Sequence, residues 1–193
     1  MKLNHFFTFF LIFELLIFSS CQKREVLTKI TKKVDSSTDI YSMKVDKNGL
    51  SHSKALIKTT YGNITFRFYP KIAPNTVSRV IQLIKDGFYD GLAFHRVLEN
   101  FIIQTGDPTN TGNGGSGKKL KAEINDLQHI KGTIAMARSL SDIDSADSQF
   151  YISLRTLPEL NNKYTVFAQV IDGISILDKV KVNDRILSIE YLE

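Results

Sequence analysis

The sequence predicts a mainly β fold, either a barrel or a sandwich, over residues 54–193 of the 193-residue chain. Short strand-like segments recur along this stretch, and Gly, Pro and Asn turn signals separate them. Only two segments have helical character. Apolar residues make up 42% of the chain, which is enough for one hydrophobic core.

The stretch opens with a predicted β-hairpin followed by a predicted helix. Residues 54–60 and 63–69 are rich in β-branched and aromatic residues, and they flank a tight turn at Gly62. Pro70 ends the second strand, and Pro74 fits the first turn of a helix. The apolar stripe of this helix consists of Val77, Val80, Ile81 and Ile84.

Short strands make up most of the remaining sequence. They are predicted over residues 94–98, 102–105, 133–137, 148–153, 165–171 and 186–191. A brief second helix is predicted over residues 174–180, before the last strand. Many short strands with few helices are typical of barrels and sandwiches.

Residues 1–20 have the features of a signal peptide. An apolar run over residues 6–18 follows Lys2 and is shorter than the roughly 20 residues that span a bilayer. Cys21 comes directly after two serines, an arrangement that resembles a bacterial lipoprotein signal. In such signals the cysteine carries the lipid and becomes the mature N-terminus. A plain cleaved signal and an uncleaved anchor are the alternatives.

Residues 21–53 are polar and show no sustained period, so we expect a flexible, lipid-anchored tether. Seven Lys/Arg and four Asp/Glu in this segment contribute to a net charge of +5. A mildly basic tether suits an anionic membrane surface. No aromatic-plus-basic RNA motif is present, so nucleic acid is not an expected partner.

Several other chemistries are disfavoured by the residues available. One cysteine allows no intramolecular disulfide and no cysteine-based zinc site. Residues 112–119 nearly match a phosphate-binding loop, but Lys119 replaces the required Ser or Thr. The acidic residues within 142–147 lack the spacing of a calcium-binding EF-hand loop. The sequence therefore predicts no metal site.

Three segments carry a resemblance to a known family. They are residues 94–107 (FHRVLENFIIQTGD), 132–138 (GTIAMAR) and 148–153 (SQFYIS). Together they resemble the cyclophilin family, and bacterial members in particular. Residues 73–77, 87–91 and 164–170 also match in order and spacing, so the resemblance covers roughly residues 54–193. Several motifs in the right order are more specific than any single one.

The resemblance implies a closed eight-stranded antiparallel β-barrel capped by two α-helices, with a substrate groove on its outside. The family's catalytic arginine falls on Arg96, and Gln104 belongs to the same catalytic group. The family's substrate-binding residues fall on His95, Phe101, Ile102, Ala137, Arg138, Gln149, Tyr151, Leu160 and Tyr164. The proline pocket is expected at Phe101, Ile102, Tyr151, Leu160 and Tyr164.

Strand alternation supports part of this site independently of the resemblance. Gln149 and Tyr151 share one face of a strand, whereas Phe150 points to the other face, toward the core. Ile102 and Gln104 likewise share a face. Tyr151 stands where the family usually has phenylalanine, so its hydroxyl must face water or find a partner.

The resemblance implies a peptidyl-prolyl cis/trans isomerase that acts on proline-containing polypeptides and assists the folding of exported proteins. The reaction breaks no covalent bond, so it requires no metal or cofactor. The alternative is a catalytically weak chaperone or adhesin module that holds proline-containing segments on the cell envelope. We expect an exported monomer, facing the periplasm or the cell exterior and held at a membrane by a lipid on Cys21.

Overall fold

The computed structural model describes residues 53–192. The predicted signal peptide, the lipidation site Cys21 and the predicted tether up to residue 52 lie outside the described residues. Ser53 is buried, and its carbonyl oxygen accepts a hydrogen bond from the amide of Phe68 at 3.0 Å. The hydroxyls of Ser53 and Tyr191 lie 2.7 Å apart. Among the described helices, none has the length and apolar character needed to cross a bilayer.

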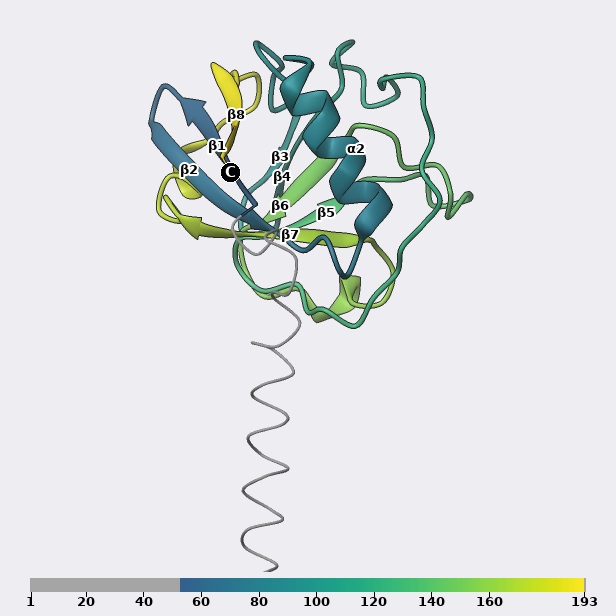
Figure 1. Ribbon diagram of the computed structural model, residues 1–193. Helices are drawn as coiled ribbons and strands as arrows, with labels where there is room; N and C mark the ends of the chain where they lie inside the picture. The colour runs from purple at the N-terminus through teal and green to yellow at the C-terminus, as the bar shows by residue number, and fades with distance from the viewer. Residues whose placement is uncertain (1–52, 193) are drawn as a thin grey trace, which may run out of the picture. The chain divides into compact units, whose positions relative to one another are not determined.

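Eight antiparallel strands form one curved sheet (Figure 1). They are β1 (Lys54–Thr59), β2 (Gly62–Phe68), β3 (Arg96–Leu98), β4 (Ile102–Thr105), β5 (Thr133–Met136), β6 (Phe150–Ser153), β7 (Val166–Asp172) and β8 (Ser188–Leu192). Their order across the sheet is β3-β4-β6-β5-β7-β2-β1-β8. The mainly β prediction is confirmed, and each of the eight predicted strands is present.

The sheet is an open half-barrel, which corrects the expected closed barrel. Within residues 53–192, no ladder joins the edge strands β3 and β8. The segments that precede these strands meet in a single bridge, between Ala93 and Arg185. Further backbone hydrogen bonds join residues 91–94 to residues 183–186, and left-handed backbone at Gly91 (φ 76°) and Asn183 (φ 71°) makes this contact irregular.

One α-helix, α2 (Pro74–Lys85), packs beside the sheet (Figure 1). It buries Val77, Val80, Leu83 and Ile84 against the core. The second expected α-helix, over residues 174–180, is instead a short 3-10 helix, η3 (Leu177–Lys179). The backbone becomes extended at Val180 (φ −66°, ψ 132°), so too few helical residues are available for α-helical hydrogen bonds.

The N-terminus of α2 is capped by a residue distant in sequence. Ala73, at the N-cap position, offers no side-chain acceptor. The carboxylate of Glu123 accepts hydrogen bonds from the amides of Asn75 at 3.0 Å and Thr76 at 2.8 Å. Burial by itself raises the pKa of Glu123, but these hydrogen bonds outweigh it and lower the pKa. Glu123 therefore ties a long loop to the helix.

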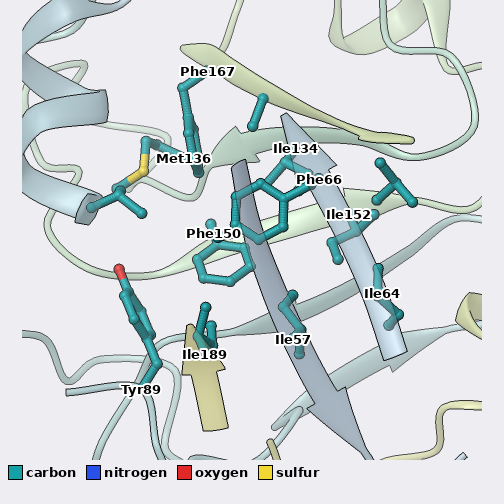
Figure 2. Packing of buried hydrophobic residues seen from close by; sticks show 14 of the residues in the cluster. Ile57, Ile64, Phe66, Tyr89, Ile134, Met136, Phe150, Ile152, Phe167 and Ile189 are labelled. Carbon is teal, nitrogen blue, oxygen red and sulfur yellow. The ribbon is translucent and has the colours of Figure 1, made fainter. Parts of the chain in front are cut away.

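The larger of two apolar clusters, the inner cluster, packs buried side chains from most of the strands against one another (Figure 2). Its largest fully buried members include Phe66, Tyr89, Phe150, Phe167 and several isoleucines. The Tyr89 hydroxyl donates a hydrogen bond to the carbonyl oxygen of Ser148 at 3.1 Å. This satisfies the polar end of an otherwise apolar side chain.

A second apolar cluster, the outer cluster, lies on the opposite face. Its buried members are Ile102, Ala135, Tyr151, Leu157 and Val166, and Tyr69, Phe101, Leu127, Ala137, Leu160 and Tyr164 pack against them. Phe150 belongs to the inner cluster and Tyr151 to the outer cluster, which confirms the predicted alternation. Every residue of β4, β5 and β6 is buried, because both faces of these strands are covered.

Candidate active site

A row of side chains crosses the outer face of the sheet from β3 to β5. Arg96 pairs with Gln104, Gln104 with Tyr151, and Tyr151 with Ala135 in the strand registers. Directly opposed residues of antiparallel strands place their side chains on the same face. Arg96 donates a hydrogen bond from Nη1 to Oε1 of Gln104 at 3.1 Å. The row therefore places an exposed guanidinium beside the outer cluster.

Hydrogen bonds extend this row to a glycine-rich loop at residues 112–117. Gln104 donates from Nε2 to Oε1 of Gln149 at 2.8 Å. Gln149 in turn donates from Nε2 to the carbonyl oxygens of Gly112 at 3.0 Å and Gly114 at 2.8 Å. Each amide oxygen accepts and each amide nitrogen donates, so the orientations of both glutamines are fixed.

The glycine-rich loop is anchored by two carboxylates of the protein itself. Asp107 accepts hydrogen bonds from the amides of Thr109 at 2.7 Å and Gly112 at 2.6 Å. Burial by itself raises the pKa of Asp107, but the hydrogen bonds from Thr109 and the loop amides lower it to about 2. Asp147 accepts amide hydrogens from the far end of the loop. Amides that could otherwise hold a phosphate are therefore occupied.

The outer cluster gathers the predicted apolar site residues around the row. Phe101, Ile102, Ala137, Tyr151, Leu160 and Tyr164 all belong to it. The rings of Tyr151 and Tyr164 meet edge to face, with centroids 5.6 Å apart and planes at 90°. The Arg138 guanidinium lies 5.0 Å above the Tyr164 ring and donates hydrogen bonds to the Lys163 carbonyl oxygen.

His95, unlike Arg138, contacts no ring of the outer cluster and does not belong to the row. It directly precedes β3, where strand alternation directs it away from the face that carries Arg96. Its ring is half-buried near Asp107 and Gln149. Burial lowers the pKa of His95, and the negative charge of Asp107 partly opposes that shift.

Two residues at the site had no assigned role in the sequence. His129 is fully buried, and its Nε2 lies 2.8 Å from the hydroxyl of Tyr151. Asn161 contacts the other ring nitrogen of His129. The sequence did indicate that Tyr151, if buried, would need a hydrogen-bond partner for its hydroxyl. The partner could not be identified, because no local pattern relates residues 22 positions apart in loop and strand.

Comparisons with known proteins agree with this geometry. Residues 54–188 match the model of the family "Cyclophilin type peptidyl-prolyl cis-trans isomerase/CLD". A peptidyl-prolyl cis-trans isomerase of Helicobacter pylori is 42% identical over 141 residues, which cover 71% of this chain and 85% of the relative. The corresponding isomerase of Synechococcus elongatus is 40% identical over 142 residues, which cover 72% of this chain and 97% of the relative.

Solved structures show the same likeness. A cyclophilin-type isomerase of Cryptosporidium parvum has a TM-score of 0.67 and 30% identity, with coverage of 74% of this chain and 98% of that one. A second crystal structure of that protein, in the presence of the dipeptide Ala-Pro, has a TM-score of 0.66 and 30% identity, with coverage of 72% of this chain and 99% of that one. The chain belongs to the cyclophilin family and is a peptidyl-prolyl cis-trans isomerase.

Proposed function

We propose that the outer cluster holds the proline of an Xaa-Pro segment while Arg96 accelerates rotation about the preceding peptide bond. One observation carries this proposal: the Arg96 guanidinium and the apolar cluster share one face and are joined through Gln104. An apolar concavity with a few convergent polar groups is typical of ligand sites.

The chemistry of rotation suits an arginine. Amide resonance produces a barrier of about 18–20 kcal/mol, and uncatalysed exchange of Xaa-Pro bonds takes tens to hundreds of seconds. Resonance is lost in the twisted transition state, so the prolyl nitrogen gains a lone pair. A guanidinium can donate a hydrogen bond to this nitrogen or stabilise the turning carbonyl. This interaction is stronger in the transition state than in the ground state, as catalysis requires.

The hydrogen-bond chain prepares Arg96 for this role. Gln104 holds one terminal nitrogen of the guanidinium, and Gln149 and the glycine-rich loop hold Gln104 in turn. Within residues 53–192 the guanidinium donates one hydrogen bond, to Gln104. Its other N–H groups can therefore reach a substrate. Preorganised donors need little rearrangement during the reaction.

The test is isomerisation of a short Xaa-Pro peptide by the wild type, Arg96→Ala and Arg96→Lys. We expect kcat/KM to fall about 10²–10³-fold for the alanine variant, because the transition-state donor is lost. The lysine variant keeps the charge without the planar donors and should lose roughly tenfold. Arg185→Ala, which changes an arginine outside the row and the outer cluster, is the matched control.

The same measurements distinguish the alternative function. A wild-type protein that binds the peptide without accelerating its exchange would be a module for holding proline-containing segments. Equal kcat/KM values for the wild type and Arg96→Ala would instead leave catalysis in place and assign it to other groups.

We also propose that the isomerase is exported and held at the cell envelope by a lipid on Cys21, where it acts on exported polypeptides. The apolar run over residues 6–18 and the serines before Cys21 support this proposal. In a bacterial host, the full chain should partition into the detergent phase and Cys21→Ser into the aqueous phase. Identical partitioning of the two proteins would contradict lipidation.

A further inference from the structure

A buried polar chain lies beneath the proposed proline pocket. The hydroxyl of Tyr151 meets Nε2 of His129 at 2.8 Å, and Nδ1 of His129 lies 3.2 Å from Oδ1 of Asn161. Tyr151 is 3% exposed and His129 is 0% exposed. Polar groups buried this deeply are costly unless each finds a partner. The chain supplies those partners behind a ring that faces the pocket.

The direction of each hydrogen bond can be assigned. Oδ1 of Asn161 also accepts a hydrogen bond from the backbone amide of His129 at 2.8 Å, which identifies this atom as the oxygen. Nδ1 of His129 therefore carries the proton and donates to Asn161. Nε2 is then an acceptor, so the Tyr151 hydroxyl donates to it. Burial lowers the pKa of His129 and favours this neutral form.

Ring contacts restrict the remaining freedom of Tyr151. The imidazole of His129 lies nearly parallel to the Tyr151 ring, with centroids 5.9 Å apart and planes at 13°. Tyr164 packs edge-on against both rings, at 5.6 Å from Tyr151 and 6.4 Å from His129. Tyr151 is thus held at its hydroxyl by His129 and at its ring by Tyr164. Its backbone lies in β6, between Gln104 and Ala135 of the row.

We infer that His129, oriented by Asn161, is a positioning residue that fixes the Tyr151 ring as the floor of the proline pocket and sets the affinity for proline. This inference rests on the proposed function of the outer cluster. A fixed floor contacts the proline ring equally before and during rotation. Such uniform binding changes KM and the dissociation constant but leaves kcat largely unchanged.

The chain offers a matched pair of substitutions at one site. The amide oxygen of His129→Gln can occupy the place of Nε2, so it can still accept a hydrogen bond from the Tyr151 hydroxyl. The shorter His129→Asn can replace Nδ1 only, so it loses that contact. Val80→Ala, which removes methyl groups from a buried position of α2, controls for lost stability alone.

The experiment measures peptide dissociation constants and isomerisation kinetics for these variants of the full chain. We expect His129→Asn to raise the dissociation constant and KM roughly three- to tenfold, with kcat changed less than about twofold. His129→Gln should recover most of the affinity. Val80→Ala should lower the thermal midpoint while its dissociation constant stays at the wild-type value.

Two outcomes would overturn the inference. One is wild-type affinity in His129→Asn despite lowered stability, which would make His129 a structural residue only. The other is equal loss of affinity in His129→Asn and His129→Gln, because the atom at the Nε2 position would then be irrelevant. A wild-type protein that binds the peptide without catalysis would contradict the proposed function, while the dissociation constants would still test the positioning role.

Discussion

At the scale of single residues, the proposed site contains side chains whose polar ends are hydrogen-bonded to residues behind them. Gln104 and Gln149 anchor Arg96, whereas His129 anchors Tyr151. The first anchor leaves donors of the guanidinium available, and the second buries the tyrosine hydroxyl. Because its hydroxyl is bound to His129, Tyr151 is supported from behind the proposed pocket and adds no free polar group to its surface.

The protonation of His129 predicts a pH dependence of stability. Burial lowers its pKa in the folded state, with the Asn161 hydrogen bond and Glu159 opposing part of the shift, whereas an unfolded histidine titrates near 6.5. Below that pH the unfolded chain binds more protons than the folded one. The free energy of unfolding should therefore be fully retained above pH 6.5 and decrease as the pH falls below it.

Denaturant unfolding of the wild type and His129→Gln between about pH 5 and 8 checks this expectation. The glutamine variant should show a shallower loss of stability on acidification. A residual slope is expected, because burial also lowers the pKa of His95. Identical pH profiles for the two proteins would show that protonation of His129 does not cause the loss of stability.

At the scale of secondary-structure elements, α2 depends on a loop for its N-terminal cap. Two amides at the start of the helix donate to the carboxylate of Glu123, and a negative charge there also interacts favourably with the helix dipole. The same loop continues toward Leu127 and His129 at the outer cluster. The cap therefore connects the helix on one side of the sheet with the pocket on the other.

Removal of this cap should destabilise the protein measurably. We expect Glu123→Ala to lower the free energy of unfolding by about 1–2 kcal/mol, and Glu123→Gln by less, because its amide oxygen can still accept one hydrogen bond. Asp126→Ala, an exposed position in the same loop, is the control and should change stability little. Urea unfolding measures all three, and equal stability of Glu123→Ala and the wild type would refute the cap.

The elements differ in how far the sequence could predict them. Period-two alternation and Gly/Pro turn signals are local, so all eight strands and the start of α2 at Pro74 were predictable. The open edge between β3 and β8, the shortening of the second helix and the cap by Glu123 depend on tertiary contacts. The proposed site residues were assigned through the family resemblance, whereas His129 was not, because its contact with Tyr151 links two distant segments.

At the scale of the whole molecule, residues 53–192 supply a continuous sheet, two apolar clusters and the polar row. Ser53 contributes to this unit, since its carbonyl accepts the Phe68 amide and its hydroxyl lies next to that of Tyr191. Every described member of the row and the outer cluster lies in this unit. Catalysis and membrane attachment should therefore be separable.

Two truncated chains test this separation. A chain that begins at Ser53 should fold cooperatively and keep the kcat/KM of the full-length protein within about twofold. A chain that begins at Ala55 lacks the Ser53 contacts and should lose roughly 1 kcal/mol of stability. Loss of activity in the chain that begins at Ser53, despite a folded state, would mean that the preceding segment takes part in catalysis.

Because β4, β5 and β6 are covered on both faces, the sheet separates the inner and outer clusters, which share no residue. One cluster forms the inner core, and the other contains the proposed proline pocket. Changes at Phe101, Leu160 or Tyr164 can reshape the binding surface without altering the packing of Phe66, Phe150 and Phe167. Such a division should allow mutations to change substrate preference while the fold is retained.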